Sequence, residues 1–232
     1  MKFIICLINA VVILLVTVST LNAFKVTKPF GRSSLLMSLP ANQVIVVTGM
    51  GVVSPSGTTV NQFFDNICNG VSGVSKLDRF DPSPYKCQIA AQIRDFDGKS
   101  FYKSKKKFKQ NDLSCHYAVA ASHMALADAG LDLSSPGIDA TRAGVIIGSA
   151  FGGMDTFEKA ANSLANFGPA SIDPYTIPMI LGNTPAGIIG METGAKGPNF
   201  GVQTACATAT HAFGEVHKYL ITYFVVNHII HF

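Results

Sequence analysis

The sequence predicts an α/β fold built on a mainly parallel sheet. Short apolar runs alternate along the chain with helical patterns, an order that implies parallel βαβ units. The chain has 232 residues, of which 48% are hydrophobic and 14% are charged, so it can bury a sizeable core and lacks the composition of a disordered protein. The formal charge of +4 is modest and the basic residues form no long stripe, which argues against nucleic acid as a partner.

The first half of the body has the cap and stop residues that such elements need. Thr58 or Thr59 can cap a helix, and Gly130 stands where a long helical pattern ends. Gly49 and Gly51 match part of a dinucleotide-binding fingerprint, but no third glycine lies at the required offset, so no such site is assigned. The predicted elements are a buried strand at 44–47, a tight turn at 48–51, a helix from Thr58 or Thr59 to Asn69, a strand at 87–93 and a helix at 112–129.

The second half repeats this alternation and then changes character. The predicted elements are a buried strand at 145–148, a helix through Phe157 and Leu164, a helical segment at 174–191 broken near Pro185, a strand at 200–204 and a helix at 206–219. Residues 220–232 are apolar, prone to β-structure and without charge, and such a tail is hard to solubilise when exposed. We interpret 43–219 as the domain and 220–232 as an anomalous tail, most simply explained by a translated intron or a frameshift.

The N-terminal residues have the pattern of a two-part leader. Residues 1–23 combine a charged start with an apolar run too short for a comfortable membrane span, as in a signal peptide. Residues 24–42 are basic, contain hydroxyl side chains and lack acids, which resembles a transit peptide. With Phe24 at the junction, the leader resembles that of proteins imported into complex plastids, so we expect the plastid stroma. Secretion is one alternative, and an uncleaved anchor that ties the chain to a membrane is another.

Cys206 stands out among the five cysteines. A short β-prone run ends on Cys206, and a helical pattern starts directly behind it. This arrangement places a thiol at the positive end of a helix dipole beside free backbone N–H groups, which favours a nucleophilic thiolate. Taken alone, however, a free cysteine is more often a buried core residue.

The other cysteines and the histidines predict neither disulfides nor a metal site. No pair of cysteines has CxxC spacing, and His228 and His231 have no third ligand nearby in the sequence. We interpret four cysteines as core or leader residues, and we expect no metal and no cofactor. These four are Cys6, Cys68, Cys87 and Cys115.

Three motifs resemble those of the β-ketoacyl-acyl-carrier-protein synthases that elongate fatty acids. They are Val47-Thr48-Gly49-Met50-Gly51-Val52-Val53-Ser54-Pro55, Gly148-Ser149-Ala150-Phe151-Gly152-Gly153 and Thr204-Ala205-Cys206-Ala207-Thr208, the last preceded by Gly194-Ala195-Lys196-Gly197-Pro198-Asn199. They occur in the family's order over residues 44–219. The resemblance implies a thiolase-like fold of two similar halves, each a layered α/β/α unit with a mixed, mainly parallel sheet. This chain carries the N-terminal half, so we expect apolar surface that the other half normally buries to be exposed.

The same resemblance implies a 3-oxoacyl synthase of fatty-acid biosynthesis. In the family, a cysteine like Cys206 takes the acyl chain from a carrier-protein thioester, and the carbanion from decarboxylated malonyl-carrier protein then attacks it. The implied partners are acyl- and malonyl-loaded carrier protein and, at full length, a second copy in a homodimer. The family's two catalytic histidines and its lysine belong to the other half, and His211 and His217 are not assigned their role. We therefore expect no condensation by the 232-residue chain alone.

Three further residues acquire expected roles from the resemblance. Phe151 stands where the family usually has a smaller residue lining the acyl pocket, so it is expected to shorten the acyl chain that fits; packing in the core is the equal alternative. Lys106 and Lys109 resemble the basic positions that dock the acidic carrier protein, with a solvated basic turn as the equal alternative. The segment 111–114, Asn-Asp-Leu-Ser, departs from the family's Asp-Arg-Phe, and the lost arginine is expected to weaken an ion pair or an interface contact.

Two other classes of function remain open at this point. The chain can be a non-catalytic interaction subunit that binds carrier protein or an intact synthase. It can also be a secreted or membrane-anchored protein in which the domain serves binding.

Overall fold

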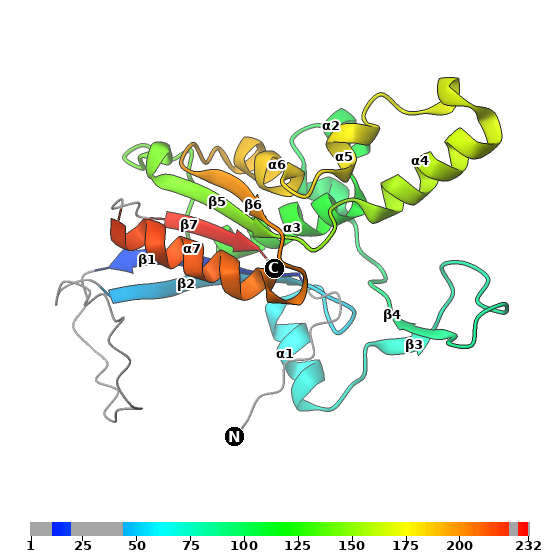
Figure 1. Ribbon diagram of the computed structural model, residues 1–232. Coiled ribbons are helices and arrows are strands. Elements are labelled where there is room, and N and C mark those ends of the chain that lie inside the picture. The colour runs from blue at the N-terminus through cyan, green and yellow to red at the C-terminus, as the bar shows by residue number, and fades with distance from the viewer. Residues whose placement is uncertain (1–10, 20–43, 223–226, 232) are drawn as a thin grey trace, which may run out of the picture.

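A computed structural model describes residues 11–19, 44–222 and 227–231 of the chain (Figure 1). The strands are β1 (Val11–Ser19), β2 (Val44–Val53), β3 (Val74–Lys76), β4 (Ile89–Ala91), β5 (Ala143–Gly148), β6 (Asn199–Val202) and β7 (Asn227–His231). The α-helices are α1 (Val60–Cys68), α2 (Lys105–Lys109), α3 (Leu113–Asp128), α4 (Met154–Phe167), α5 (Thr176–Ile180), α6 (Thr184–Thr193) and α7 (Thr208–Thr222). Short 3-10 turns are η1 (Gly98–Phe101), η2 (Ala140–Arg142), η3 (Pro169–Ser171) and η4 (Ala205–Ala207).

A five-stranded sheet in the order β2-β1-β7-β5-β6 forms the middle layer. β5 is parallel to β6 and β7, whereas β1 is antiparallel to β7 and β2. Four of the five strands therefore run in one direction and β1 alone runs against them, which confirms the mixed, mainly parallel sheet. β3 and β4 form a separate antiparallel hairpin that includes part of the predicted strand at 87–93.

Helices cover both faces of this sheet, as a layered α/β/α fold requires. α3 and α6 pack together on one face, and α7 lies across β5, β6 and β7 on the other (Figure 1). β5 shows why its sequence is apolar throughout: Val145 and Ile147 belong to the core under α3 and α6, whereas Ile146 belongs to the core under α7. Alternate residues of a strand point to opposite faces, so a strand covered on both sides cannot alternate apolar with polar residues.

Two of the sheet's strands come from outside the predicted domain. β1 lies within the predicted signal peptide and pairs with β2, while β7 comes from the predicted tail and lies between β1 and β5. The rest of residues 1–43 lies outside the described residues, so the two-part leader stays a prediction. Among the residues that the structure describes, no helix is both long and apolar enough to cross a membrane.

The predicted turn at 48–51 is wrong, because β2 continues through both glycines to Val53. A Cβ atom on Gly49 would lie 2.2 Å from the carbonyl oxygen of Ala125, and one on Gly51 would lie 2.0 Å from that of Ala121. The two glycines thus let the backbone of α3 lie directly against β2. Their spacing serves helix–strand packing, which is consistent with rejecting a dinucleotide fingerprint.

The cap and stop residues act as the sequence predicts. Thr59 caps α1 by accepting a hydrogen bond from the Gln62 N–H at 3.3 Å, and Asp112 caps α3. Gly130 follows α3 with φ of +64°, a conformation that costs glycine little. The helical segment at 174–191 is broken between α5 and α6, with Pro185 in the first turn of α6.

Candidate active site

Cys206 lies in a short turn between β6 and α7. The predicted helix starts two residues later than expected, because Ala205 to Ala207 form the turn η4 ahead of α7. Ala205 has φ of +50°, a left-handed conformation that costs a non-glycine residue about 1–2 kcal/mol. The Cys206 residue that follows is exposed. The chain thus turns sharply at Cys206 and presents the thiol outward. We call residues 204–208 the elbow.

Threonine side chains hold the elbow in shape. The Thr204 N–H donates to Thr208 Oγ1 at 2.8 Å, and the Ala207 N–H donates to the Thr204 carbonyl at 3.1 Å. Thr208 is buried against the end of β5, where a Cβ on Gly148 would lie 2.3 Å from Thr208 Cγ2. The second and third sequence motifs therefore meet in space, with Gly148 allowing the approach.

His211 lies closer to the elbow than the sequence indicates. Its Nδ1 is 2.7 Å from Thr204 Oγ1, although from the sequence we assigned His211 no role at the thiol. Thr204 and His211 are seven residues apart, about two helical turns, and that spacing is the signal that could have placed them together. His217 has no contact of this kind with the elbow in the part of the chain that the structure describes.

Phe151 lines a cavity of about 470 Å³ between the loop after β5, α4 and β6. The Phe151 side chain is 74% exposed, so the alternative of packing in the core is wrong for this chain. Gln203, three residues before Cys206, lines the same cavity, while Cys206 itself is not among its lining residues. The following Gly152 and Gly153 let this loop approach α5, because Cβ atoms there would lie 2.4 Å from the Ile180 carbonyl and 2.2 Å from that of Met179.

Lys106 and Lys109 lie on α2 and are both exposed. They are one helical turn apart, so they share a face of the helix. Lys109 also lines a second cavity, of about 530 Å³, together with Arg79 and Lys159. Arg79, Lys109 and Lys159 thus line one cavity, and no residue of the elbow lines it.

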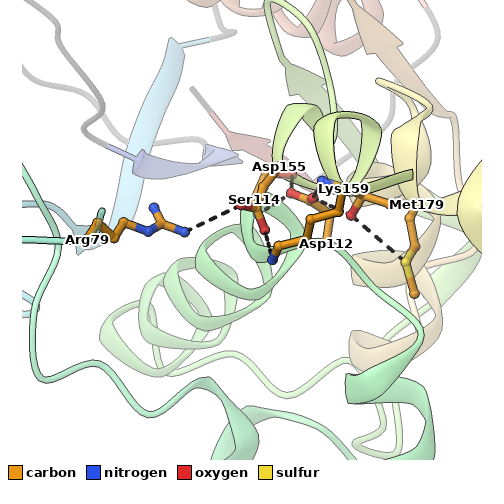
Figure 2. Close-up of polar contacts among 7 residues, drawn as sticks. Arg79, Asp112, Ser114, Asp155, Lys159 and Met179 are labelled. Carbon is orange, nitrogen blue, oxygen red and sulfur yellow. Dashed lines mark hydrogen bonds and ion pairs between the residues drawn. The ribbon is translucent and has the colours of Figure 1, made fainter. Parts of the chain in front are cut away.

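Asp112 ties the start of α3 to the start of α4 beside this second cavity (Figure 2). Its Oδ1 accepts from the Ser114 N–H at 2.9 Å, and its Oδ2 accepts from the Thr156 hydroxyl at 2.6 Å and the Thr156 N–H at 3.1 Å. Burial alone would raise the pKa of this carboxyl, but the hydrogen bonds from Thr156 and Ser114 hold that pKa below its usual value. Asp155 pairs with Arg79 and Lys159 at the rim. The segment 111–114 therefore supplies a hydrogen-bonded link between the two helices.

The remaining cysteines differ in their surroundings. Cys115 is buried, and burial raises the pKa of its thiol to about 12. Cys68 and Cys87 are exposed, which the interpretation as core residues did not anticipate. Within the described ranges, no group of three or more metal-ligating side chains could hold a metal ion.

Sequence reasoning missed Glu192, a fully buried carboxylate near the end of α6. It is the only charged residue in that helix, and this isolation in an apolar pattern is the signal that could have drawn attention to it.

Comparison with known proteins connects this geometry to a family. The family model described as "Beta-ketoacyl synthase, N-terminal domain" matches residues 42–221. A 3-oxoacyl-[acyl-carrier-protein] synthase 2 of Staphylococcus aureus (strain COL) is 38% identical over 177 residues, which are 76% of this chain and 42% of that protein. The chain thus spans less than half the length of this curated relative.

Solved structures show the same fold. The ishigamide ketosynthase/chain length factor matches with a TM-score of 0.70 and 26% identity, over 77% of this chain and 44% of that one. A type II polyketide ketosynthase, solved in complex with its acyl-carrier protein, matches in fold with a TM-score of 0.65 and 22% identity, over 78% of this chain and 47% of that one. Their fold and the family match lead to one conclusion: this chain belongs to the β-ketoacyl synthase family, which it matches over the N-terminal domain and in its thiolase-like fold.

Proposed function

We propose that the chain supplies the acyl-accepting half of a 3-oxoacyl-[acyl-carrier-protein] synthase of fatty-acid biosynthesis. The observation that carries this proposal is the elbow, where a strained residue presents the exposed Cys206 between β6 and α7. Strain of this kind persists where the surrounding structure enforces it, and such positions cluster at active sites.

Cys206 performs the first chemical step in this proposal. The Cys206 thiol loses its proton, its sulfur attacks the carbonyl carbon of a carrier-protein thioester, the bond to the carrier's sulfur breaks, and the carrier leaves as a thiolate that takes up a proton. A backbone N–H at the elbow donates to the oxyanion of the tetrahedral intermediate. Decarboxylation of malonyl-carrier protein then supplies the carbanion for condensation. That second step needs groups that we place in the other half of the complete enzyme.

Phe151 limits the acyl chain in the same proposal. Its exposed ring lines the apolar cavity that also reaches Gln203, so a large side chain here reduces the space available to the acyl tail. Equal loading of short and long acyl chains by wild type and Phe151→Gly in the complete enzyme would remove this role.

An acidic acyl carrier protein is the proposed partner, docking on the face of Lys106 and Lys109. Opposite charge steers such an encounter, and both lysines are exposed. The solved ketosynthase bound to its acyl-carrier protein shows that a protein of this fold can take such a partner. A homodimer at full length and import into the plastid stroma complete the proposal.

Mapping of acyl transfer by mass spectrometry tests the central step. After incubation with an acyl-loaded carrier protein, the peptide containing Cys206 gains the mass of the acyl group, and Cys206→Ala abolishes this gain. Cys68 and Cys87 are exposed as well and serve as internal controls within the same chain. Labelling spread evenly over the three cysteines, or absent from all of them, contradicts the proposal.

A carrier-binding interaction subunit is the second candidate function. It is favoured by the separation of α2 from the elbow, because the lysines can bind a carrier without any use of the thiol. Carrier affinity unchanged in Cys206→Ala, with no acyl transfer by wild type, would select this candidate over the first.

A further inference from the structure

Glu192 is a buried carboxylate whose position needs an explanation. It lies in the last turn of α6 with 1% of its surface exposed, and none of the motifs uses it. A carboxylate buried this deeply is costly unless charges or hydrogen bonds compensate it.

Both oxygens of Glu192 meet the basic segment 103–109, which is far away in the sequence. Oε2 accepts a hydrogen bond from the backbone N–H of Lys103 at 2.9 Å. Oε1 lies 3.8 Å from the Nζ atom of Lys107 and, in the described structure, has no hydrogen-bond partner. The carboxylate thus binds the segment at its first residue and again within α2.

The basic segment cannot hold this shape by itself. α2 has five residues, four of them lysines, and a helix this short is not stable alone. Lysines three and four positions apart repel one another and weaken it further. Phe108 provides one anchor by stacking on His116 with ring centroids 3.9 Å apart. Glu192 provides the other.

With α2 anchored in this way, one of its lysines points toward Glu192 and the other three remain exposed to solvent. Lys107 faces Glu192 and is half-buried, while Lys105, Lys106 and Lys109 stay exposed. The exposed set includes the two lysines assigned to carrier docking. Without Glu192, the orientation of this helix depends on the ring contacts of Phe108 and on local hydrogen bonds such as that from Asn111 Nδ2 to the Lys107 carbonyl.

We propose that Glu192 is a positioning residue, which holds the segment 103–109 in the shape that an acidic carrier protein binds. This inference rests on the proposed docking function and adds a buried residue to it. The predicted change in affinity is opposite to that from charge alone. Removing a negative charge should by general electrostatics tighten the binding of an acidic partner. Losing the anchor at Glu192 should instead weaken this binding.

The test compares two matched variants of the 232-residue chain in binding to an acyl carrier protein at low salt. Glu192→Gln removes the buried charge and should raise Kd about tenfold. Glu158→Gln makes the same change at an exposed position of α4 and should leave Kd unchanged or slightly lower. Glu192→Met keeps the volume, removes the acceptor as well and serves if Glu192→Gln folds poorly. Faster hydrogen exchange of the Lys103 amide in Glu192→Met reports the lost anchor without any carrier protein.

The outcomes separate this inference from the docking function. If Glu192→Gln binds as tightly as Glu158→Gln while the double variant Lys106→Ala, Lys109→Ala binds weakly, Glu192 has no positioning role and the docking function stands. If wild type does not bind the carrier protein, the docking function fails and the inference falls with it.

Discussion

α3 and α4 are helices of similar length in opposite surroundings. α3 has nine buried residues and joins β2, β5 and α6 in the main core. α4 has no buried residue, and Met154, Phe157, Leu164 and Phe167 on it are at least half exposed. Figure 1 shows α3 packed behind the sheet and α4 projecting away from it.

The difference shows which side of the domain this chain completes by itself. On the α3 side, nine residues of the helix are buried in contact with the strands and with α6. On the α4 side an amphipathic helix leaves its apolar residues in solvent, and apolar clusters of this kind mark surfaces that another polypeptide covers. Part of the exposed apolar surface expected of half a thiolase-like fold is therefore found at α4, beside the cavity lined by Phe151.

The largest predicted effect concerns the contact between β2 and α3. Gly51→Val places a side chain where a Cβ already lies 2.0 Å from the Ala121 carbonyl, so we expect a loss of about 4 kcal/mol or more, or no folded protein. Gly187→Ala in α6 is the control, since a Cβ there meets nothing within 4 Å. Urea unfolding measures both, and similar midpoints for the two variants would contradict the close packing of α3 on β2.

A matched pair of leucines probes the two helices directly. Leu126 on α3 is 6% exposed, whereas Leu164 on α4 is 50% exposed. Leu126→Ala should cost about 3 kcal/mol of unfolding free energy, and Leu164→Ala less than about 0.5 kcal/mol. Equal costs would mean that α4 is packed as tightly as α3 in solution.

A buried histidine on α3 should make the stability depend on pH. Burial lowers the pKa of His116 to about 4, against the 6.5 of an ordinary histidine, so the folded state favours the neutral ring. Above pH 6.5 the ring is neutral in both states and does not change the free energy of unfolding. As the pH falls toward 4, the unfolded state binds a proton more readily than the folded state, so the free energy of unfolding falls by about 2–3 kcal/mol. Unfolding at pH 7 and pH 4.5 should show this drop in wild type and a smaller one in His116→Gln. The exposed His217 is the control, and an equal effect of His217→Gln would contradict the assignment.

Asp112 links α3 to α4 by hydrogen bonds. Its substitution should cost less free energy of unfolding than Gly51→Val or Leu126→Ala. Asp112→Asn keeps a good helix cap but weakens the bonds to Thr156, which should cost about 1 kcal/mol. Because the folded pKa of Asp112 lies below its usual value, its contribution is present above pH 4 and is lost as the pH falls further. The difference between wild type and variant should therefore shrink at acid pH, and a difference independent of pH would exclude the charge as its cause.

Local features of the chain were predictable, and long-range contacts were not. Asp112 and Gly130 fix the ends of α3 by their own chemistry, and the β-prone run followed by a helical pattern predicts the strand-to-helix junction that carries Cys206, although not the turn η4 within it. Gly49 and Gly51 misled the prediction, because their purpose depends on α3, which lies more than 60 residues later in the sequence.

The contacts of Glu192 escaped prediction for the same reason. Its partner Lys103 is 89 residues away, and no local pattern records that pairing. The positions of β1 and β7 likewise depend on pairing between the two ends of the chain.

Hydrogen exchange read by mass spectrometry tests most directly whether the domain is complete on one side only. In the 232-residue chain, amides of α3 should exchange only through global unfolding, while those of α4 should exchange at least about 100-fold faster through local opening. Equal protection of α3 and α4 would contradict the account, because it would mean that this chain finishes both sides of the fold by itself.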